Sequence, residues 1–156
     1  MRVILALLAS LAALLPSGGS WSQTSPSAAP GDSAAAISRL LSSTFEKPDS
    51  RLLLDPIVVE GKAAVVGWVQ GDLAGRAFLR ESDGHWAIVA CGGDALKDVS
   101  TLQRLGLSQA QADRLSAAMA AAEARIDPQR VARFATFGEL VEMSGEAHTP
   151  ANPQRH

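Results

Sequence analysis

Four strand-like runs follow one another in the middle of the chain, separated by very short turns. The first turn is Gly61-Lys62, and the last contains Asp83-Gly84, a dipeptide that strongly favours hairpins. Parallel strands need a crossover of a dozen or more residues, so these turns indicate an antiparallel meander. The expected strands cover residues 52–60, 63–70, 76–81 and 85–91. Pro56 lacks a backbone N–H, which places the first strand at an edge or a bulge.

Helices are expected on both sides of these strands. Asp32 or Ser33 can cap a short helix before the first strand. The apolar face of that helix consists of Ile37, Leu40 and Leu41. After the fourth strand, Asp94 can cap a helix over 95–104, which Gly106 ends.

The last third of the chain predicts two more helices. Ser108 and Gln111 form a capping-box signature at the start of the first. The apolar stripe of this helix consists of Leu115, Met119, Ala122 and Ile126. Asp127-Pro128 begins a short helix that carries Val131 and Phe134, and residues 137–143 can form a last edge strand.

The expected fold class is α+β. It has an N-terminal helix, a four- to five-stranded antiparallel sheet, and two to three helices packed on one face of the sheet. This arrangement resembles the small cone-shaped folds of the nuclear-transport-factor-like class, a likeness of fold that implies no activity.

The N-terminus has the pattern of a secretory signal peptide over residues 1–22. Arg2 precedes an apolar run at 3–15, and small residues follow, with cleavage fitting after Ser20 or Ser22. As a helix the run would span about 20 Å, short of the roughly 30 Å of a bilayer core. We therefore expect export to the periplasm or the medium, with no stable membrane insertion after the signal is removed.

The rest of the chain divides into three expected parts. Residues 23–31 are rich in Ser, Pro and Ala and predict a flexible linker, 32–143 a single domain, and 144–156 a disordered tail. A net charge of −2 without a basic run argues against nucleic-acid binding.

The lone cysteine, Cys91, ends the fourth strand and precedes Gly92-Gly93-Asp94. It can be a soft metal ligand, its thiolate favoured by the N-terminus of the helix that comes next. The commoner state of a free cysteine is a small buried residue at a strand end. His85 lies about 20 Å away along an extended strand, too far to share one metal ion with Cys91.

A second set of soft ligands lies at the C-terminus, where Met143, His148 and His156 could converge on copper. A polar tail with scattered histidines needs no such role. Because the chain contains no catalytic motif of the Ser-hydrolase, zinc-protease or Cys-x-x-Cys type, we expect no enzyme activity.

Three further side chains bear on binding. Trp68 and Trp86 are core candidates that could also line a cavity. Arg76 shares one strand face with Arg80 and Phe78, which predicts a face that is partly solvated or meets a partner.

Several runs together resemble the copper uptake system-associated proteins, small exported proteins of alphaproteobacteria. These runs are TFEKPD at 44–49, PIVV at 56–59, GWVQG at 67–71, GRA at 75–77, HWAIVACGGD at 85–94 and RVARF at 130–134. The resemblance covers roughly residues 34–143. It implies a non-enzymatic accessory role in copper uptake and homeostasis, with Cu(I) or a copper-uptake protein as partner.

Two functional hypotheses therefore stand. One is the periplasmic copper accessory protein, with Cys91, Met143, His148 and His156 as candidate ligands. The other is a module that binds a small non-metal ligand or a peptide.

Overall fold

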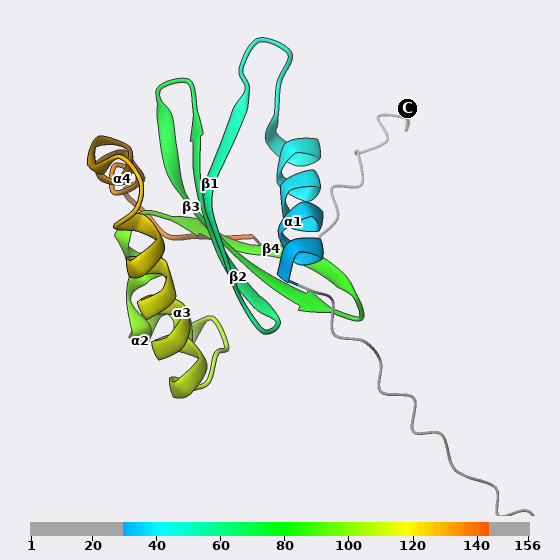
Figure 1. Ribbon diagram of the computed structural model, residues 1–156, viewed down its shortest axis with the longest axis vertical. Helices are drawn as coiled ribbons and strands as arrows, with labels where there is room; N and C mark the ends of the chain where they lie inside the picture. The colour runs from blue at the N-terminus through cyan, green and yellow to red at the C-terminus, as the bar shows by residue number, and fades with distance from the viewer. Residues whose placement is uncertain (1–29, 144–156) are drawn as a thin grey trace, which may run out of the picture.

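The computed structural model describes residues 30–143. They form a five-stranded sheet with helices on both sides (Figure 1). The strands are β1 (Leu52–Glu60), β2 (Ala63–Gln70), β3 (Leu73–Ser82), β4 (His85–Gly92) and β5 (Val141–Glu142). The helices are α1 (Pro30–Phe45), the 3₁₀ turn η1 (Asp94–Lys97), α2 (Val99–Arg104), α3 (Gln109–Glu123) and α4 (Pro128–Phe134).

The sheet is the antiparallel meander that the short turns predict, with strand order β1-β2-β3-β4-β5. Gly71 adopts a φ of +58°, which glycine reaches without steric cost. It therefore closes a two-residue turn with Asp72, and β3 begins at Leu73, three residues before the expected start at residue 76. Pro56 lies in β1, an edge strand whose register shifts between Leu54 and Ile57, as the missing N–H predicts.

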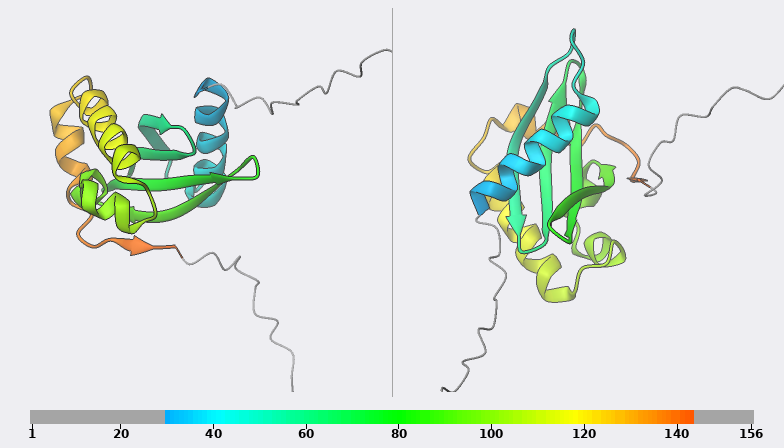
Figure 2. Two further views of the ribbon diagram at one scale, coloured as in Figure 1. Left: turned by 90° about the horizontal axis from the view of Figure 1, so that it is seen from below. Right: turned by 90° about the vertical axis from the view of Figure 1, so that its right-hand side faces the viewer.

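Both faces of the sheet are covered by helices. Successive side chains of a strand point to opposite faces, so neighbouring residues belong to different layers of the core. Val66 packs against Ile37 and Leu41 of α1, whereas Val65 packs against Leu115 and other residues of the α2–α3 layer. In the right-hand view of Figure 2, α1 crosses in front of the strands and α2 and α3 lie behind them. The expected α+β class is confirmed.

Helix ends follow local chemistry. The Ser108–Gln111 capping box and the Asp127 cap with Pro128 at the first helical turn are both present. Helix α1 begins at Pro30, earlier than the Asp32 or Ser33 cap predicts, and so it extends into the expected linker.

The prediction of a single helix over 95–104 is wrong. Asp98 accepts a hydrogen bond from the backbone N–H of Thr101 and caps a new helix there, which leaves η1 as a separate turn. The hydroxyl of Ser100 also donates to this carboxylate, and the hydrogen bonds from Ser100 and Thr101 lower the pKa of the Asp98 carboxyl. The expected last strand is also shorter than predicted: only Val141–Glu142 pairs as β5, next to β4.

Within residues 30–143, none of the helices combines the length and the apolar character that crossing a bilayer requires.

Candidate functional site

An apolar pocket of about 280 Å³ lies between the C-terminal half of α1 and the sheet. Its wall comes from α1, all of the first four strands and the segment that leads into and beyond β5. The lining residues are Leu41, Phe45, Leu52, Leu54, Trp68, Gln70, Leu73, Ala77, Cys91, Phe137, Val141 and Met143. None of them carries a charge.

Strand register builds the floor of this pocket. Ala77 lies opposite Cys91, which in turn lies opposite Val141, so these three side chains form one row across β3, β4 and β5. Leu52, Gln70 and Leu73 form a second row across β1, β2 and β3. At Ala77 the floor of the pocket therefore carries only a methyl group.

A glycine makes one side of the pocket aromatic. Gly75 has no side chain, and a Cβ there would lie 2.9 Å from the Trp68 ring and 3.1 Å from Phe137. Both rings occupy that space and meet edge to face, with centroids 5.8 Å apart and planes at 77°. The pair therefore brings Phe137, far along the chain, against β2.

Gln70 is the polar side chain of the lining that can both donate and accept hydrogen bonds. Its Nε2 donates to the carbonyl oxygen of Phe45 and to that of Ser50, each at 2.8 Å. The last carbonyls of a helix have no partner inside the helix, so Gln70 satisfies the end of α1. The same amide therefore links the end of α1 to the segment that precedes β1, beside the pocket.

Cys91 and Met143 both line this pocket, so two of the four predicted soft ligands share one site. The backbone N–H of Met143 donates to the carbonyl of Val89 at 2.7 Å and fixes this end of the segment on β4. Predicted ligands His148 and His156 lie outside the described residues.

The Cys91 thiol is buried, and burial raises its pKa above the ordinary value. The expectation of a helix N-terminus that favours the thiolate is therefore wrong. The chain after Cys91 instead enters the four-residue turn η1, with the carboxylate of Asp94 in its first turn. Cys91 thus has the character of a buried neutral thiol that can still act as a soft ligand.

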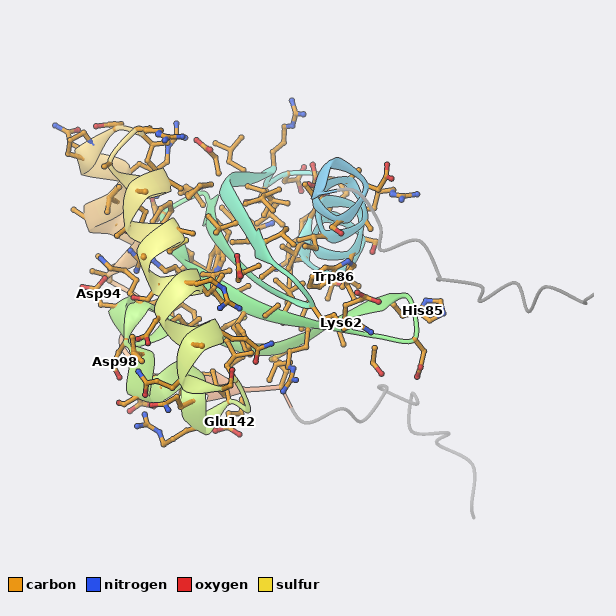
Figure 3. All side chains as sticks on the ribbon, turned by 60° about the horizontal axis from the view of Figure 1, so that its bottom comes forward. Lys62, His85, Trp86, Asp94, Asp98 and Glu142 are labelled. Atoms are coloured by element: carbon orange, nitrogen blue, oxygen red, sulfur yellow. The ribbon has the colours of Figure 1, made fainter. Side chains whose placement is uncertain are left out.

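His85 and Trp86 lie away from the pocket, at the β3–β4 hairpin (Figure 3). His85 is exposed at the opposite end of β4 from Cys91, in line with the distance estimated from the sequence. Trp86 borders a separate, open hollow together with His85 and Arg39. The two tryptophans therefore line different cavities, since Trp68 belongs to the apolar pocket.

The expectation of a partly solvated strand face is wrong at Arg76. Its side chain is fully buried rather than solvated, and it bonds Glu123 at 2.7 Å and Asp94 at 3.0 Å. Its guanidinium lies 5.3 Å from the centre of the Phe134 ring. Arg80 remains near the surface and donates to the carbonyl oxygens of Leu105 and Gly106, so the two arginines have different surroundings.

Sequence reasoning missed several residues of the pocket, chiefly Gln70 and Phe137. Gln70 had a detectable signal, because it follows Trp68 at the two-residue period of one strand face. Phe137 had none, since its contact with Trp68 depends on where the chain returns after α4. Among residues 30–143 no three His, Cys, Asp or Glu side chains come together as a metal-binding group.

Comparison with protein-family models, with curated proteins and with solved structures finds no match to this chain. The geometry of the pocket is therefore the basis for assigning a function.

Proposed function

We propose that the protein is a non-enzymatic binding module that holds a small, uncharged apolar molecule in the pocket beneath α1. The observation that carries this proposal is the lining: apolar side chains surround a space of about 280 Å³, whereas protein cores are ordinarily close-packed.

The volume bounds the size of the ligand. An apolar cavity of about 150 Å³ holds benzene, so 280 Å³ suits a molecule with on the order of ten non-hydrogen atoms. A peptide strand or a long acyl chain is too large to be enclosed.

The rim of the pocket supports entry of such a molecule from solvent. Leu73, Val141 and Met143 are exposed by 67%, 46% and 38%, and all three belong to the lining.

Ala77→Ile is expected to weaken binding of an apolar probe such as p-cymene by at least about tenfold, because the added carbons occupy the floor of the pocket. Isothermal titration calorimetry on the purified protein measures the affinity for p-cymene. The matched control is Ala87→Ile, the same change at an exposed position of β4, which should leave the affinity unchanged.

Methyl chemical shifts in the wild-type protein provide a second test that does not depend on the variant's folding. p-Cymene should shift the methyl signals of Leu41, Leu54 and Val141 most strongly. No binding by the wild-type protein, or shifts confined to other regions, would contradict the proposed function.

A second candidate function is the periplasmic copper accessory protein, in which the protein binds Cu(I) or a copper-uptake partner after export. Its support is that Cys91 and Met143 line one pocket, since thiolate and thioether are ligands that Cu(I) prefers. The resemblance of the runs around residues 44–94 and 130–134 favours the same role.

A Cu(I) titration against a competing chelator, without oxygen, tests this candidate. Cys91 binds the metal as a thiolate and not as a thiol, and burial raises the pKa of this thiol. Binding therefore releases a proton, and the apparent affinity should rise about tenfold per pH unit between pH 6 and pH 8. Cys91→Ser and Met143→Leu should each weaken binding, whereas truncation after Met143 should not. Loss on truncation alone would place the metal at His148 and His156 instead.

A further inference from the structure

The side-chain amide of Gln70 has a fixed orientation. Both neighbours of its Nε2, the carbonyl oxygens of Phe45 and Ser50, can only accept hydrogen bonds. The nitrogen must therefore be the atom that faces them, and both of its hydrogens are used. The remaining atom, Oε1, lies on the other side of the amide and has lone pairs to offer.

Gln70 Oε1 receives no hydrogen bond from any side chain or backbone group within residues 30–143. In that part of the chain, Arg76 Nη2 is the one fully buried side-chain nitrogen or oxygen atom without a partner. Gln70 Oε1 is not among such atoms. Gln70 is half-buried and lines the pocket, so Oε1 is the strong hydrogen-bond acceptor that this side chain can offer to a molecule there.

From this geometry we infer that the pocket selects a neutral apolar molecule that carries one hydroxyl or N–H donor, which bonds to Gln70 Oε1. The inference rests on the proposed ligand-binding function and names its ligand class. An ether or ketone gains no hydrogen bond from Gln70, because both N–H donors of this amide are already engaged. A carboxylate is rejected, since the lining contains no cation to offset the loss of its hydration.

Four small probes with a common carbon skeleton test this selectivity on the unmodified mature protein. Thymol carries a hydroxyl donor, thymol methyl ether carries an acceptor alone, p-cymene carries neither, and 4-isopropylbenzoate carries a negative charge. Calorimetry should give thymol about two- to tenfold tighter binding than the ether or p-cymene, the size of one hydrogen bond in a protein. 4-Isopropylbenzoate should bind at least about a hundredfold more weakly than thymol.

Gln70→Leu is the matching protein variant. It removes Oε1 along with the two bonds to the backbone, so any change in pocket shape affects thymol and p-cymene alike. The readout is the ratio of the two affinities, which should fall to about one. A purely structural role of Gln70 would weaken both probes and leave the ratio unchanged.

The outcomes separate the two proposals. Equal binding of thymol, its ether and p-cymene would overturn the donor selectivity and leave the apolar pocket intact as the function. Tighter binding of the ether than of p-cymene, or tight binding of the benzoate, would also overturn the selectivity. Absence of binding by all four probes would overturn the proposed function, and the selectivity with it.

Discussion

Replacing Glu123 by alanine is expected to lower the free energy of unfolding by about 3–5 kcal/mol, because it leaves the buried charge of Arg76 without its closest partner. Arg76 is fully buried, and its bond to Asp94 reaches a carboxylate that is 63% exposed and better hydrated. Urea unfolding at pH 7, followed by circular dichroism, measures the loss.

The control is Glu60→Ala, which breaks the ion pair with Arg114 at the surface. Exposed pairs of this kind contribute about 1 kcal/mol or less. The double change Arg76→Met with Glu123→Leu should recover much of the loss, since no buried charge remains. Equal losses of stability in Glu123→Ala and Glu60→Ala would contradict the conclusion that the buried charge of Arg76 requires Glu123 as its partner.

Phe134→Ala is expected to cost about 3–5 kcal/mol as well, through the cavity that loss of a fully buried ring leaves. The ring fills the space that a side chain at Gly67 would need, where a Cβ would come within 2.7 Å of it. Phe134 is also the buried residue of α4, so its loss should free the helix and weaken the placement of Phe137 in the pocket.

Phe45→Ala is the matched control for this prediction. It makes the same change at a half-buried position, and so its cost should be clearly smaller. The same urea titrations compare the two variants. The p-cymene affinity of Phe134→Ala, measured against that of the wild-type protein, reports the effect on the pocket. A Phe134→Ala variant as stable as Phe45→Ala would show that α4 is not anchored by this ring.

Local features of the fold could be predicted from the sequence because the chemistry that fixes them lies within a few residues. The hairpins at Gly61 and Asp83-Gly84 and the capping box at Ser108 all have this character. The break at Asp98 is local too, since Ser100 and Thr101 bond its carboxylate, but the helical pattern over 95–104 concealed it.

Burial of Arg76 could not be predicted in this way. Its nearest partner, Glu123, is 47 residues away in the sequence and lies on α3. The alternation of β3 placed Arg76 correctly on the face shared with Phe78, but alternation does not reveal which helix will cover that face. An arginine in a strand is solvated unless a distant carboxylate meets it.

The pocket was predictable only in part for the same reason. Trp68 was a candidate for a cavity wall, and Cys91 and Met143 were grouped as soft ligands without evidence that they are close. Their proximity depends on β5 pairing with β4, a two-residue contact that brings the end of the described chain beside Cys91. The sequence predicts an edge strand over residues 137–143, but it contains no local pattern that shows which strand it pairs with.

The position of α1 has a consequence for the motions of the molecule. Within residues 30–143, α1 is the helix that covers the pocket side of the sheet, and Ile37 and Leu41 are its fully buried apolar residues. The other side is held by η1, α2 and α3, with buried leucines from each of η1 and α2. A layer with fewer buried contacts and an unfilled space opens at lower free energy than the rest.

Amide protons of α1 are therefore expected to exchange with solvent through a local opening, and those of β2 and β3 through a larger one. A molecule bound in the pocket as proposed would contact Leu41 and Phe45 and would stabilise the closed form of this layer. Hydrogen exchange along α1 should therefore become slower when the pocket is occupied, and its rate would report on ligand binding.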